Sequence, residues 1–343
     1  MNATTKDKLI AIAARLAEQA GRPRLRELVQ LKGGRNNRVF RMEMEAGEPL
    51  ALKVYFANPG DTRDRLAAEW AFLKYAWSHQ VRTIPEPLAI DRMAQAALYS
   101  FVPGEKLTPD QIGENEVDAA SDFVIAVNAP PRDVAALGAA SEACFSLTEH
   151  LGTVERRVER LNTLDTDTPL RDDAERLVGT RLRPLWQTVR SAIVTSAAQH
   201  RLSADATLGE DSCCLSPSDF GFHNALRDVA RNALTFLDFE YAGRDDPAKL
   251  VCDFFCQPET PVPLTTFDRF LQRLALGLNL DSETQTRARL LLDAYRIKWA
   301  CILLNEFLPI GAARRAFAEA DDRNLRCAAQ LRKAEAMLAQ INL

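Results

Sequence analysis

The dipeptide Pro103-Gly104 divides the chain into two stretches whose apolar residues follow different patterns. Before it, short runs rich in β-branched or aromatic residues, such as NRVFRMEME and PLALKVYF, are separated by Gly47 and Pro49. Runs of this kind predict antiparallel strands with tight connections. After it, apolar residues recur mostly at the spacing of an α-helix. We therefore expect an α+β fold with a small strand-rich lobe and a larger, mostly helical lobe.

The small lobe, residues 1–103, is predicted to hold an N-terminal helix, a five-stranded antiparallel sheet and one further helix. The first helix is amphipathic and ends at Gly21. Three strands follow in RELVQLKGG, NRVFRMEME and PLALKVYF, and two more near residues 87–91 and 97–102. The segment TRDRLAAEWAFLKYAWSH predicts the second helix, because four apolar residues recur at helical spacing: Leu66, Trp70, Leu73 and Trp77.

The second lobe, residues 104–343, is predicted to be mostly helical. A chain of 343 residues exceeds the size at which one hydrophobic core usually stops growing, which also favours two lobes. One irregular insert interrupts the helices, because CCLSPSDFGFHNAL and ALTFLDFE are typical of short strands and loops. The expected helices cover residues 115–128, 141–160, 171–200, 264–276, 282–306 and 311–340. A cleft between two such lobes is a favoured place for a small-molecule site.

Composition and charge argue against several other classes of protein. The net charge of -4 and the absence of a Lys/Arg block argue against a nucleic-acid partner. The longest apolar stretch, WACILLNEFLPIGAA, is interrupted by Asn305, Glu306 and Pro309, so we expect no membrane span and no membrane partner. The N-terminus lacks the apolar core of a signal peptide, and the seven scattered cysteines form no CxxC pair. These features predict a cytoplasmic protein with reduced thiols, and leave both a monomer and a homodimer open.

Two features of the small lobe are candidates for binding a nucleotide. Gly33 and Gly34 lie between two predicted strands, where glycine lets backbone N–H groups approach an anion, although an ordinary hairpin turn favours the same residues. Lys53 lies in the middle of PLALKVYF, and its ammonium can meet phosphates if it faces the cleft rather than solvent. Glu69, on the next helix, can then orient Lys53 as an ion pair.

The most informative stretch is LSPSDFGFHNALRD, residues 215–228, followed by LTFLDFEYAGRDDP, residues 234–247. Asp219 and Asn224 place a carboxylate and an amide in one loop. The carboxylate can accept the proton of a substrate hydroxyl, and the amide oxygen can ligate Mg²⁺. Asp238, about a hairpin later, offers a second carboxylate that can hold Mg²⁺ against phosphates. Turn residues and helix caps have the same composition, so the spacing alone leaves both interpretations open.

The order of these features is a glycine loop, a strand lysine, a helix glutamate, Asp-x₄-Asn and a strand-end aspartate, and it resembles the protein-kinase-like fold. The segments SDFGFHNAL and LDFEYAGRDDPAKLVCDF are similar to the aminoglycoside phosphotransferase and choline kinase family, and the resemblance covers nearly the whole chain. That family transfers the γ-phosphoryl group of a nucleoside triphosphate to the hydroxyl of a small molecule. The resemblance therefore implies a small-molecule kinase that uses ATP, or GTP, together with Mg²⁺.

The resemblance also implies a role for each matched side chain: catalytic base for Asp219, magnesium ligand for Asn224 and Asp238, phosphate contact for Lys53, and its ion-pair partner for Glu69. Backbone groups around Ser100 and Val102 would bind the adenine, and the loop of Gly33 and Gly34 would approach the phosphates. One departure is Pro217, which stands where the family usually has a His that organises the loop. His223, inside the loop, has no assigned role.

The acceptor is predicted to be small, because Asp246-Pro247 and a helix follow Asp238 too soon for the long activation segment of protein kinases. Four residues are predicted to contact the acceptor: Glu240, Lys298, Trp299 and Glu306. Their mixture of acidic, basic and aromatic groups suits a sugar, an amino sugar or an amino alcohol, although a core helix with a polar edge would explain the last three equally well. The alternatives are a catalytically silent pseudokinase that regulates a partner, and an aminoglycoside resistance kinase.

Overall fold

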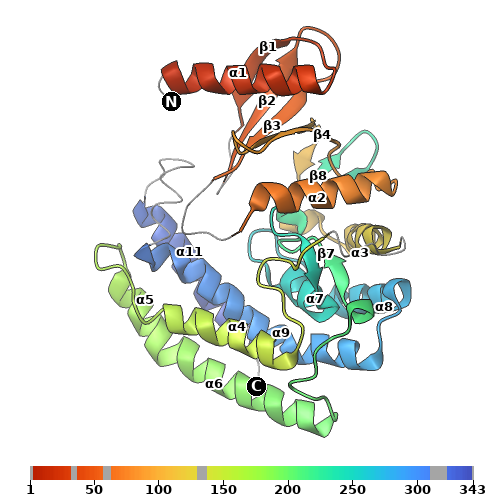
Figure 1. Ribbon diagram of the computed structural model, residues 1–343. Coiled ribbons are helices and arrows are strands. Elements are labelled where there is room, and N and C mark those ends of the chain that lie inside the picture. Colours follow the sequence, from red (N-terminus) through yellow and green to blue (C-terminus); the bar gives the residue numbers. More distant parts are fainter. Residues whose placement is uncertain (1–2, 32–36, 57–62, 130–136, 310–322, 342–343) are drawn as a thin grey trace.

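The computed structural model describes residues 3–31, 37–56, 63–129, 137–309 and 323–341. It has a sheet-containing N-terminal region and a helical C-terminal region (Figure 1). The predicted α+β class is therefore confirmed. The division into lobes at residue 103 stays a prediction, since the largest hydrophobic core includes residues from both sides of that point.

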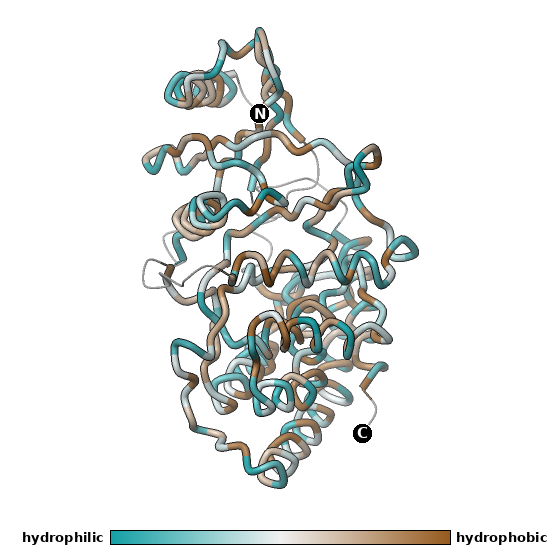
Figure 2. Tube along the Cα trace, turned by 90° about the vertical axis from the view of Figure 1, so that its right-hand side faces the viewer, coloured by the Kyte–Doolittle hydropathy of each residue, from teal (hydrophilic) through white to brown (hydrophobic). Residues whose placement is uncertain are grey.

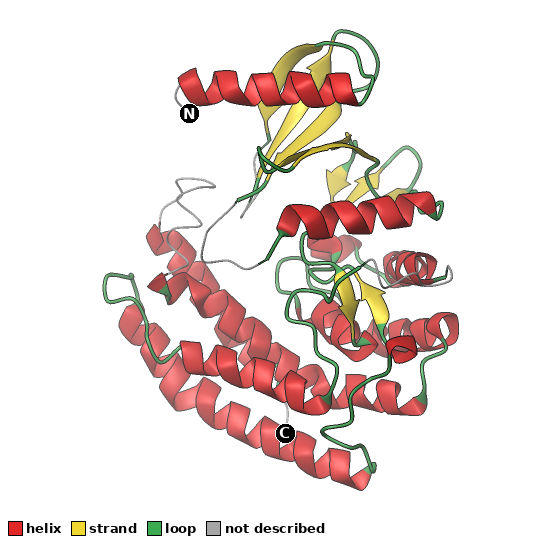
Figure 3. Cartoon of the chain, in the orientation of Figure 1, coloured by secondary structure: helices red, strands yellow, loops and turns green. Residues whose placement is uncertain are grey.

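A five-stranded antiparallel sheet forms the N-terminal region (Figure 3). Its strands are β1 (Leu25–Gln30), β2 (Arg38–Met44), β3 (Leu50–Val54), β4 (Pro87–Asp91) and β5 (Ala96–Ser100). They lie in the order β1, β2, β3, β5, β4, and every neighbouring pair is antiparallel. All five lie where the apolar runs predicted strands. Because β3 is the central strand, Lys53 has a partner on each side, Val39 of β2 and Ala97 of β5.

The two faces of this sheet pack against different helices. Leu52 belongs to an apolar cluster under α1 (Ala3–Gln19). Tyr99 belongs instead to the cluster that includes α2 (Arg65–Ser78), on the other side. Successive side chains of a strand point to opposite faces. Lys53 therefore points away from the cluster under α1 and toward the side of α2. Figure 1 shows α1 and α2 on opposite sides of the sheet.

The predicted irregular insert forms two small sheets enclosed among helices. The strand β7 (Cys214–Ser216) pairs with β10 (Gly243–Asp245). The hairpin of β8 (Ala225–Asp228) and β9 (Ala233–Phe236) is extended by the short β6 (Glu105–Lys106). Residue 219 precedes this hairpin and residue 238 follows it. The hairpin therefore brings the loops that carry the two aspartates back to one end.

Helices build the rest of the C-terminal region (Figure 3). They are α3 (Glu114–Asn128), α4 (Leu147–Arg160), α5 (Arg171–Leu177), α6 (Arg183–Gln199), α7 (Pro247–Cys256), α8 (Phe267–Leu278), α9 (Ser282–Leu303) and α11 (Arg323–Leu338). Short 3-10 segments are η1 (Pro109–Gln111), η4 (Glu210–Ser212), η5 (Phe222–Asn224), η6 (Leu264–Thr266) and η7 (Leu304–Phe307). Of the helix predicted over 311–340, residues 310–322 lie outside the described residues, and the remainder is α11.

Two details of the predicted helices are wrong. The helix expected from residue 141 begins at Leu147, because the side chain of Ser146 caps it there by accepting a hydrogen bond from the N–H of Glu149. The helix expected over 171–200 is divided by a π-helical segment, η3 (Val178–Leu182). Apolar periodicity does not mark either feature, since both depend on where backbone hydrogen bonds go.

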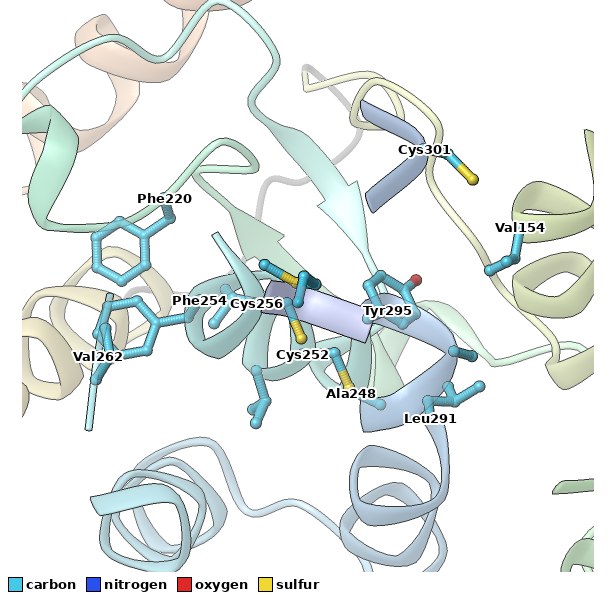
Figure 4. Close-up of a cluster of buried hydrophobic side chains, with 14 of the residues drawn as sticks. Val154, Phe220, Ala248, Cys252, Phe254, Cys256, Val262, Leu291, Tyr295 and Cys301 are labelled. Carbon is cyan, nitrogen blue, oxygen red and sulfur yellow. The ribbon is translucent and has the colours of Figure 1, made fainter. Parts of the chain in front are cut away.

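The largest hydrophobic core surrounds α7 (Figure 4). Phe254 of this helix stacks on Phe270 at 4.5 Å between ring centroids and on Phe220 at 5.2 Å. Figure 2 shows hydrophobic and hydrophilic residues interspersed along the helical turns of the chain, as expected for helices with one buried face. All seven cysteines are buried and none of them is in a disulfide, and Cys252, Cys256 and Cys301 are labelled among the apolar side chains of Figure 4. Phe220 is next to Asp219, so this core also anchors the loop.

A buried ion cluster connects α4, α7 and α9. Asp246 caps α7 by accepting from the N–H of Ala248 at 2.8 Å. Its Oδ2 lies 3.0 Å from the Nε2 of His150 and 2.5 Å from the Nε of Arg287. Burial alone lowers the pKa of His150, but the hydrogen bond to Asp246 contributes to raising it to about 9. Burial raises the pKa of Asp246, but His150 and Arg287 together lower it to about 2. Both groups are therefore charged at neutral pH.

In the described part of the chain, no helix combines the length and the apolar character that crossing a membrane requires.

Candidate active site

Lys53 lies in a buried ion cluster that joins three distant parts of the chain. Its Nζ is 2.6 Å from the Oε2 of Glu69 and 2.6 Å from the Oδ1 of Asp238, and the residue is only 8% exposed. Glu69 comes from α2, and Asp238 comes from the segment after β9. The structure thus places the strand lysine on the inner face and not on the solvent face.

The charges in this cluster depend on one another. Burial by itself lowers the pKa of Lys53, but the carboxylates of Asp238 and Glu69 outweigh it and hold that pKa well above its ordinary value. Burial raises the pKa of Glu69, and the ammonium of Lys53 works against that rise. Lys53 is therefore cationic at any physiological pH, and its charge is already positioned to meet an anion.

Two tyrosines that the sequence reasoning missed support Glu69. The hydroxyl of Tyr55 donates to the Oε2 of Glu69 at 2.7 Å, and it lies 2.7 Å from the hydroxyl of Tyr99. The other carboxylate oxygen, Oε1, accepts from the backbone N–H of Phe239 at 3.3 Å. Tyr55 comes two residues after Lys53, so strand alternation would have placed both on one face.

The loop before the β8–β9 hairpin and the segment after it are bonded together. The Nδ2 of Asn224 donates to the backbone carbonyl of Asp219 at 3.0 Å. The N–H of Leu237 donates to the carbonyl of Asn224 at 2.8 Å. Leu237 is next to Asp238, which in turn bonds Lys53. The structure therefore brings together Asp219, Asn224, Asp238, Lys53 and Glu69, which are far apart along the sequence.

The side-chain oxygens of Asn224 and Asp238 suit a magnesium ion that also binds phosphates. Because the Nδ2 of Asn224 is used by Asp219, the amide oxygen of Asn224 is turned away from that bond. Asp238 adds a carboxylate whose side chain is 39% exposed. Mg²⁺ typically takes one or two protein oxygens and completes its shell with phosphates and water. Among the residues that the structure describes, no three His, Cys, Asp or Glu side chains form a metal site, so the protein alone would not enclose the ion.

The predicted adenine contacts lie at the end of β5. Ser100 is bonded internally, since its N–H donates to the carbonyl of Glu86 and its Oγ accepts from the N–H of Glu86. Val102 lies beyond the strand, just before Gly104. Gly104 has φ +146°, and a Cβ there would be 2.8 Å from the carbonyl oxygen of Arg227, so only glycine fits this connection. The predicted phosphate loop, Gly33 and Gly34, lies outside the described residues.

Of the predicted acceptor residues on or after α9, Lys298 and Glu306 are buried and Trp299 is partly buried. The Nζ of Lys298 is 2.7 and 2.9 Å from the two carboxylate oxygens of Asp253, and the Nε1 of Trp299 donates to the same carboxylate at 2.8 Å. Glu306 is buried near Arg326, 3.6 Å from its Nε. In these places the polar groups of Lys298 and Trp299 hold α9 against α7. Contact of these residues with an acceptor stays a prediction.

Glu240 connects the two regions of the chain. Its Oε2 accepts from the Nδ2 of Asn37 at 2.5 Å, and Asn37 in turn accepts from the N–H of Phe56 at 3.2 Å. Glu240 is buried, and its charge also contributes to raising the pKa of Lys53. The carboxylate thus lies against the residue that precedes β2. Contact of Glu240 with the acceptor, which the sequence predicted, stays a prediction.

The chain has a protein-kinase-like fold, and Lys53, Glu69 and Asp238 meet at one point of it, next to the loop of Asp219. The chain belongs to the phosphotransferase enzyme family named APH, whose sequence profile matches residues 27–291. It is therefore a kinase of the small-molecule type. No curated protein sequence matches the chain.

Solved structures with the same fold cover nearly the whole chain. Choline kinase LicA from Streptococcus pneumoniae is 13% identical, with a TM-score of 0.58, over 98% of this chain and 100% of its own. Ethanolamine kinase from Plasmodium vivax is 13% identical, with a TM-score of 0.57, over 90% and 82%. The spectinomycin phosphotransferase APH(9)-Ia, solved with ADP and spectinomycin, is 10% identical, with a TM-score of 0.58, over 96% and 98%. At these identities the likeness supports the fold alone.

Proposed function

We propose that the protein is an ATP- and Mg²⁺-dependent kinase that phosphorylates a hydroxyl of a small polar metabolite, such as a sugar, an amino sugar or an amino alcohol. The observation that carries this proposal is the bridge from Glu69 through Lys53 to Asp238, together with the bond from Asn224 to Asp219. A buried cation beside an exposed carboxylate suits a triphosphate with its metal. GTP carries the same triphosphate as ATP, so it could make the same contacts with Lys53 and with the magnesium ion.

In this proposal each residue acts by position and charge. Lys53 binds phosphate oxygens, while Glu69 and Tyr55 keep its side chain in place. Asn224 and Asp238 would hold Mg²⁺, which when bound supplies positive charge beside the phosphates. Asp219 accepts the proton of the acceptor hydroxyl. The oxygen of that hydroxyl then bonds to the γ-phosphorus, while the bond between the γ-phosphorus and the oxygen that bridges it to the β-phosphate breaks and ADP leaves. Phosphoryl transfer needs little covalent participation by the protein, so alignment provides most of the acceleration.

The nucleotide base is proposed to lie at the connection around Ser100 and Val102. Because the N–H of Ser100 is already used by Glu86, we assign the backbone groups of Val102 as the adenine contacts. The fixed conformation at Gly104 places this connection directly beside β8. The loop of Gly33 and Gly34 is proposed to approach the phosphates from the sheet.

The acceptor is proposed to be small because the chain after Asp238 is short. Residues 239–246 alone separate Asp238 from α7, and β10 uses three of them. A protein kinase places a long peptide-docking segment at this point. We propose that Trp299, Lys298 and Glu306 lie on the acceptor side, where the first two fix the carboxylate of Asp253.

A coupled assay of ADP formation tests this function. Sugars, choline, ethanolamine, amino sugars and aminoglycosides are supplied with Mg-ATP, and at least one is expected to stimulate ADP formation by the wild-type protein. The matched variant Asp219→Asn keeps the shape of the side chain and loses the base, so kcat should fall by roughly 100-fold or more while ATP binding stays nearly unchanged. Full turnover by Asp219→Asn would disprove the role of Asp219. Binding of Mg-ATP without stimulation by any acceptor would favour a pseudokinase.

A further inference from the structure

The carboxylate of Asp219 is held by a side chain that lies in its own loop. The Nε2 of His223 is 3.3 Å from the Oδ1 of Asp219. Within the described residues, His223 is the one side chain that hydrogen-bonds this carboxylate. The side chain of Asp219 is 35% exposed, so without this contact it has freedom to rotate. Position 217, two residues before Asp219, is a proline, which has no side-chain donor.

The imidazole of His223 is itself fixed by close packing. A Cβ at Gly221 would lie 2.9 Å from the Nδ1 of His223 and 3.0 Å from the Cγ of Gln257, so the absence of a side chain at 221 provides the space for the ring. Gln257 is fully buried, and its Oε1 accepts from the N–H groups of Glu259 and Thr260. The imidazole of His223 therefore packs beside the hydrogen-bonded side chain of Gln257. The backbone of Gly221 is extended, with φ 166°.

The environment of the two ring nitrogens is unequal. The Nδ1 of His223 is buried and has no hydrogen-bond partner in the described part of the chain. A proton on Nδ1 would be a buried donor without an acceptor, which is costly, whereas a proton on Nε2 is donated to Asp219. The surroundings of the imidazole thus favour the tautomer in which Nε2 carries the proton.

We propose that His223 is a positioning residue that orients the carboxylate of Asp219, and that Gly221 is required because it makes room for this ring. The inference rests on the proposed function, in which Asp219 receives the proton of the acceptor hydroxyl. With Oδ1 held by His223, Oδ2 is directed to that hydroxyl. His223 touches neither substrate in this scheme; it acts through Asp219.

The hydrogen bond is tested first without any acceptor. Nitrogen-15 spectra of the histidine rings, recorded at mildly alkaline pH, are assigned by comparison with His223→Gln. The Nε2 of His223 should carry the proton, and its signal should move in Asp219→Ala, which removes the oxygen that accepts it. A proton on Nδ1, or a signal that does not respond to Asp219→Ala, would overturn the proposal even if the protein proves to be a kinase.

Kinetics with the best acceptor of the ADP screen then test the consequence. His223→Leu, which cannot donate, should lower kcat by roughly 10- to 100-fold and leave KM for ATP unchanged. His223→Gln places an amide N–H at a similar reach and should recover most of that loss, which a purely structural role for the ring would not predict. Equal kcat in the Leu and Gln variants would overturn the proposal.

The glycine provides a check that does not depend on how well His223→Leu folds. Gly221→Ala should push the ring aside and lower kcat in the wild-type background. In the His223→Ala background, where the ring is gone and only the Cγ of Gln257 is close to the new Cβ, the same change should cost clearly less activity, so the two losses should be less than additive. Fully additive losses would mean that Gly221 and His223 act independently, which contradicts the proposal. If wild-type protein forms no ADP with any acceptor, the proposed function fails, while the ring spectra still decide whether His223 holds Asp219.

Discussion

The Nζ of Lys53 and the Oδ1 of Asp238 lie 2.6 Å apart, although 185 positions separate the two residues in the sequence. Glu69 holds the other side of the same ammonium. A buried carboxylate without its cation is strongly unfavourable, so this contact constrains how the sheet meets the segment after β9. It also leaves Asp238 partly exposed, which is the condition for binding a further cation.

The substitution Lys53→Met should separate stability from activity. It leaves the buried carboxylate of Glu69 without a cation, so the free energy of unfolding should fall by about 3 kcal/mol. The double variant with Glu69→Gln removes that charge and should recover much of the stability in urea unfolding. Activity should remain low in both variants, because neither offers a cation to the phosphates. A double variant that recovered kcat would refute the phosphate role of Lys53.

Asp238→Asn should remove the dependence of nucleotide binding on Mg²⁺. Asp238 has φ +65°, and Asn tolerates that conformation, so the backbone should be preserved. Calorimetric titration with ATP should show that Mg²⁺ strengthens binding to the wild type and has little effect on the variant. The control is Asp122→Ala, a surface acid paired with Arg273, which should behave as the wild type. An undiminished Mg²⁺ effect in Asp238→Asn would place the metal elsewhere.

Stability should fall as the pH rises through the alkaline range, because of His150. Its pKa in the folded protein, about 9, exceeds the ordinary value of 6.5, so its charge stabilises the fold fully below about 6.5 and that contribution is lost between about 6.5 and 9. The gap corresponds to about 3 kcal/mol, at about 1.4 kcal/mol per pKa unit. Asp246, with a pKa of about 2 against 3.8, contributes above about 3.8 and loses its effect as the pH falls toward 2.

Thermal unfolding measured across this range checks the role of His150. The wild type should show the alkaline decline, and His150→Gln should be less stable at pH 6 with a flatter profile. His200→Gln, at an exposed histidine after α6, is the matched control and should retain the wild-type profile. A decline of the same size in His150→Gln would assign the effect to another group.

Gly243→Ala should destabilise the protein through backbone contacts alone. A Cβ at this position in β10 would lie 2.5 Å from the N of Ala140 and 2.6 Å from the carbonyl oxygen of Gly138. Overpacking of this kind costs roughly 1–3 kcal/mol, and backbone atoms cannot move aside as a flexible side chain can. Gly209→Ala, where a Cβ meets nothing within 4 Å, is the control and should be close to neutral in urea unfolding.

The sequence patterns predicted the sheet, whereas the five polar residues of the site were proposed from the resemblance to the protein-kinase-like fold. Period-two alternation shows that Lys53 points away from the face of Leu52 and Val54, but not which face of the sheet is the inner one. The short spacing between Asn224 and Asp238 indicated a hairpin, which the structure contains. Strand alternation could also have predicted that Tyr55 lies on the same face as Lys53, because it follows Lys53 by two residues. The hydrogen bonds of Lys298 and Trp299 to Asp253 could not be predicted in this way, because they depend on the packing of α9 against α7 across about 45 positions. Helix patterns show that a residue is polar, but not which distant partner it meets.

The cluster beneath α1 is separate from the core that surrounds Lys53, since the sheet lies between them. Side chains such as Leu16 and Phe40 therefore contribute to folding from the side of the sheet that carries no chemistry. Substitutions there can adjust thermal tolerance while the geometry at the lysine is preserved. The outer face of the sheet is thus the region where this enzyme can be tuned without altering what it catalyses.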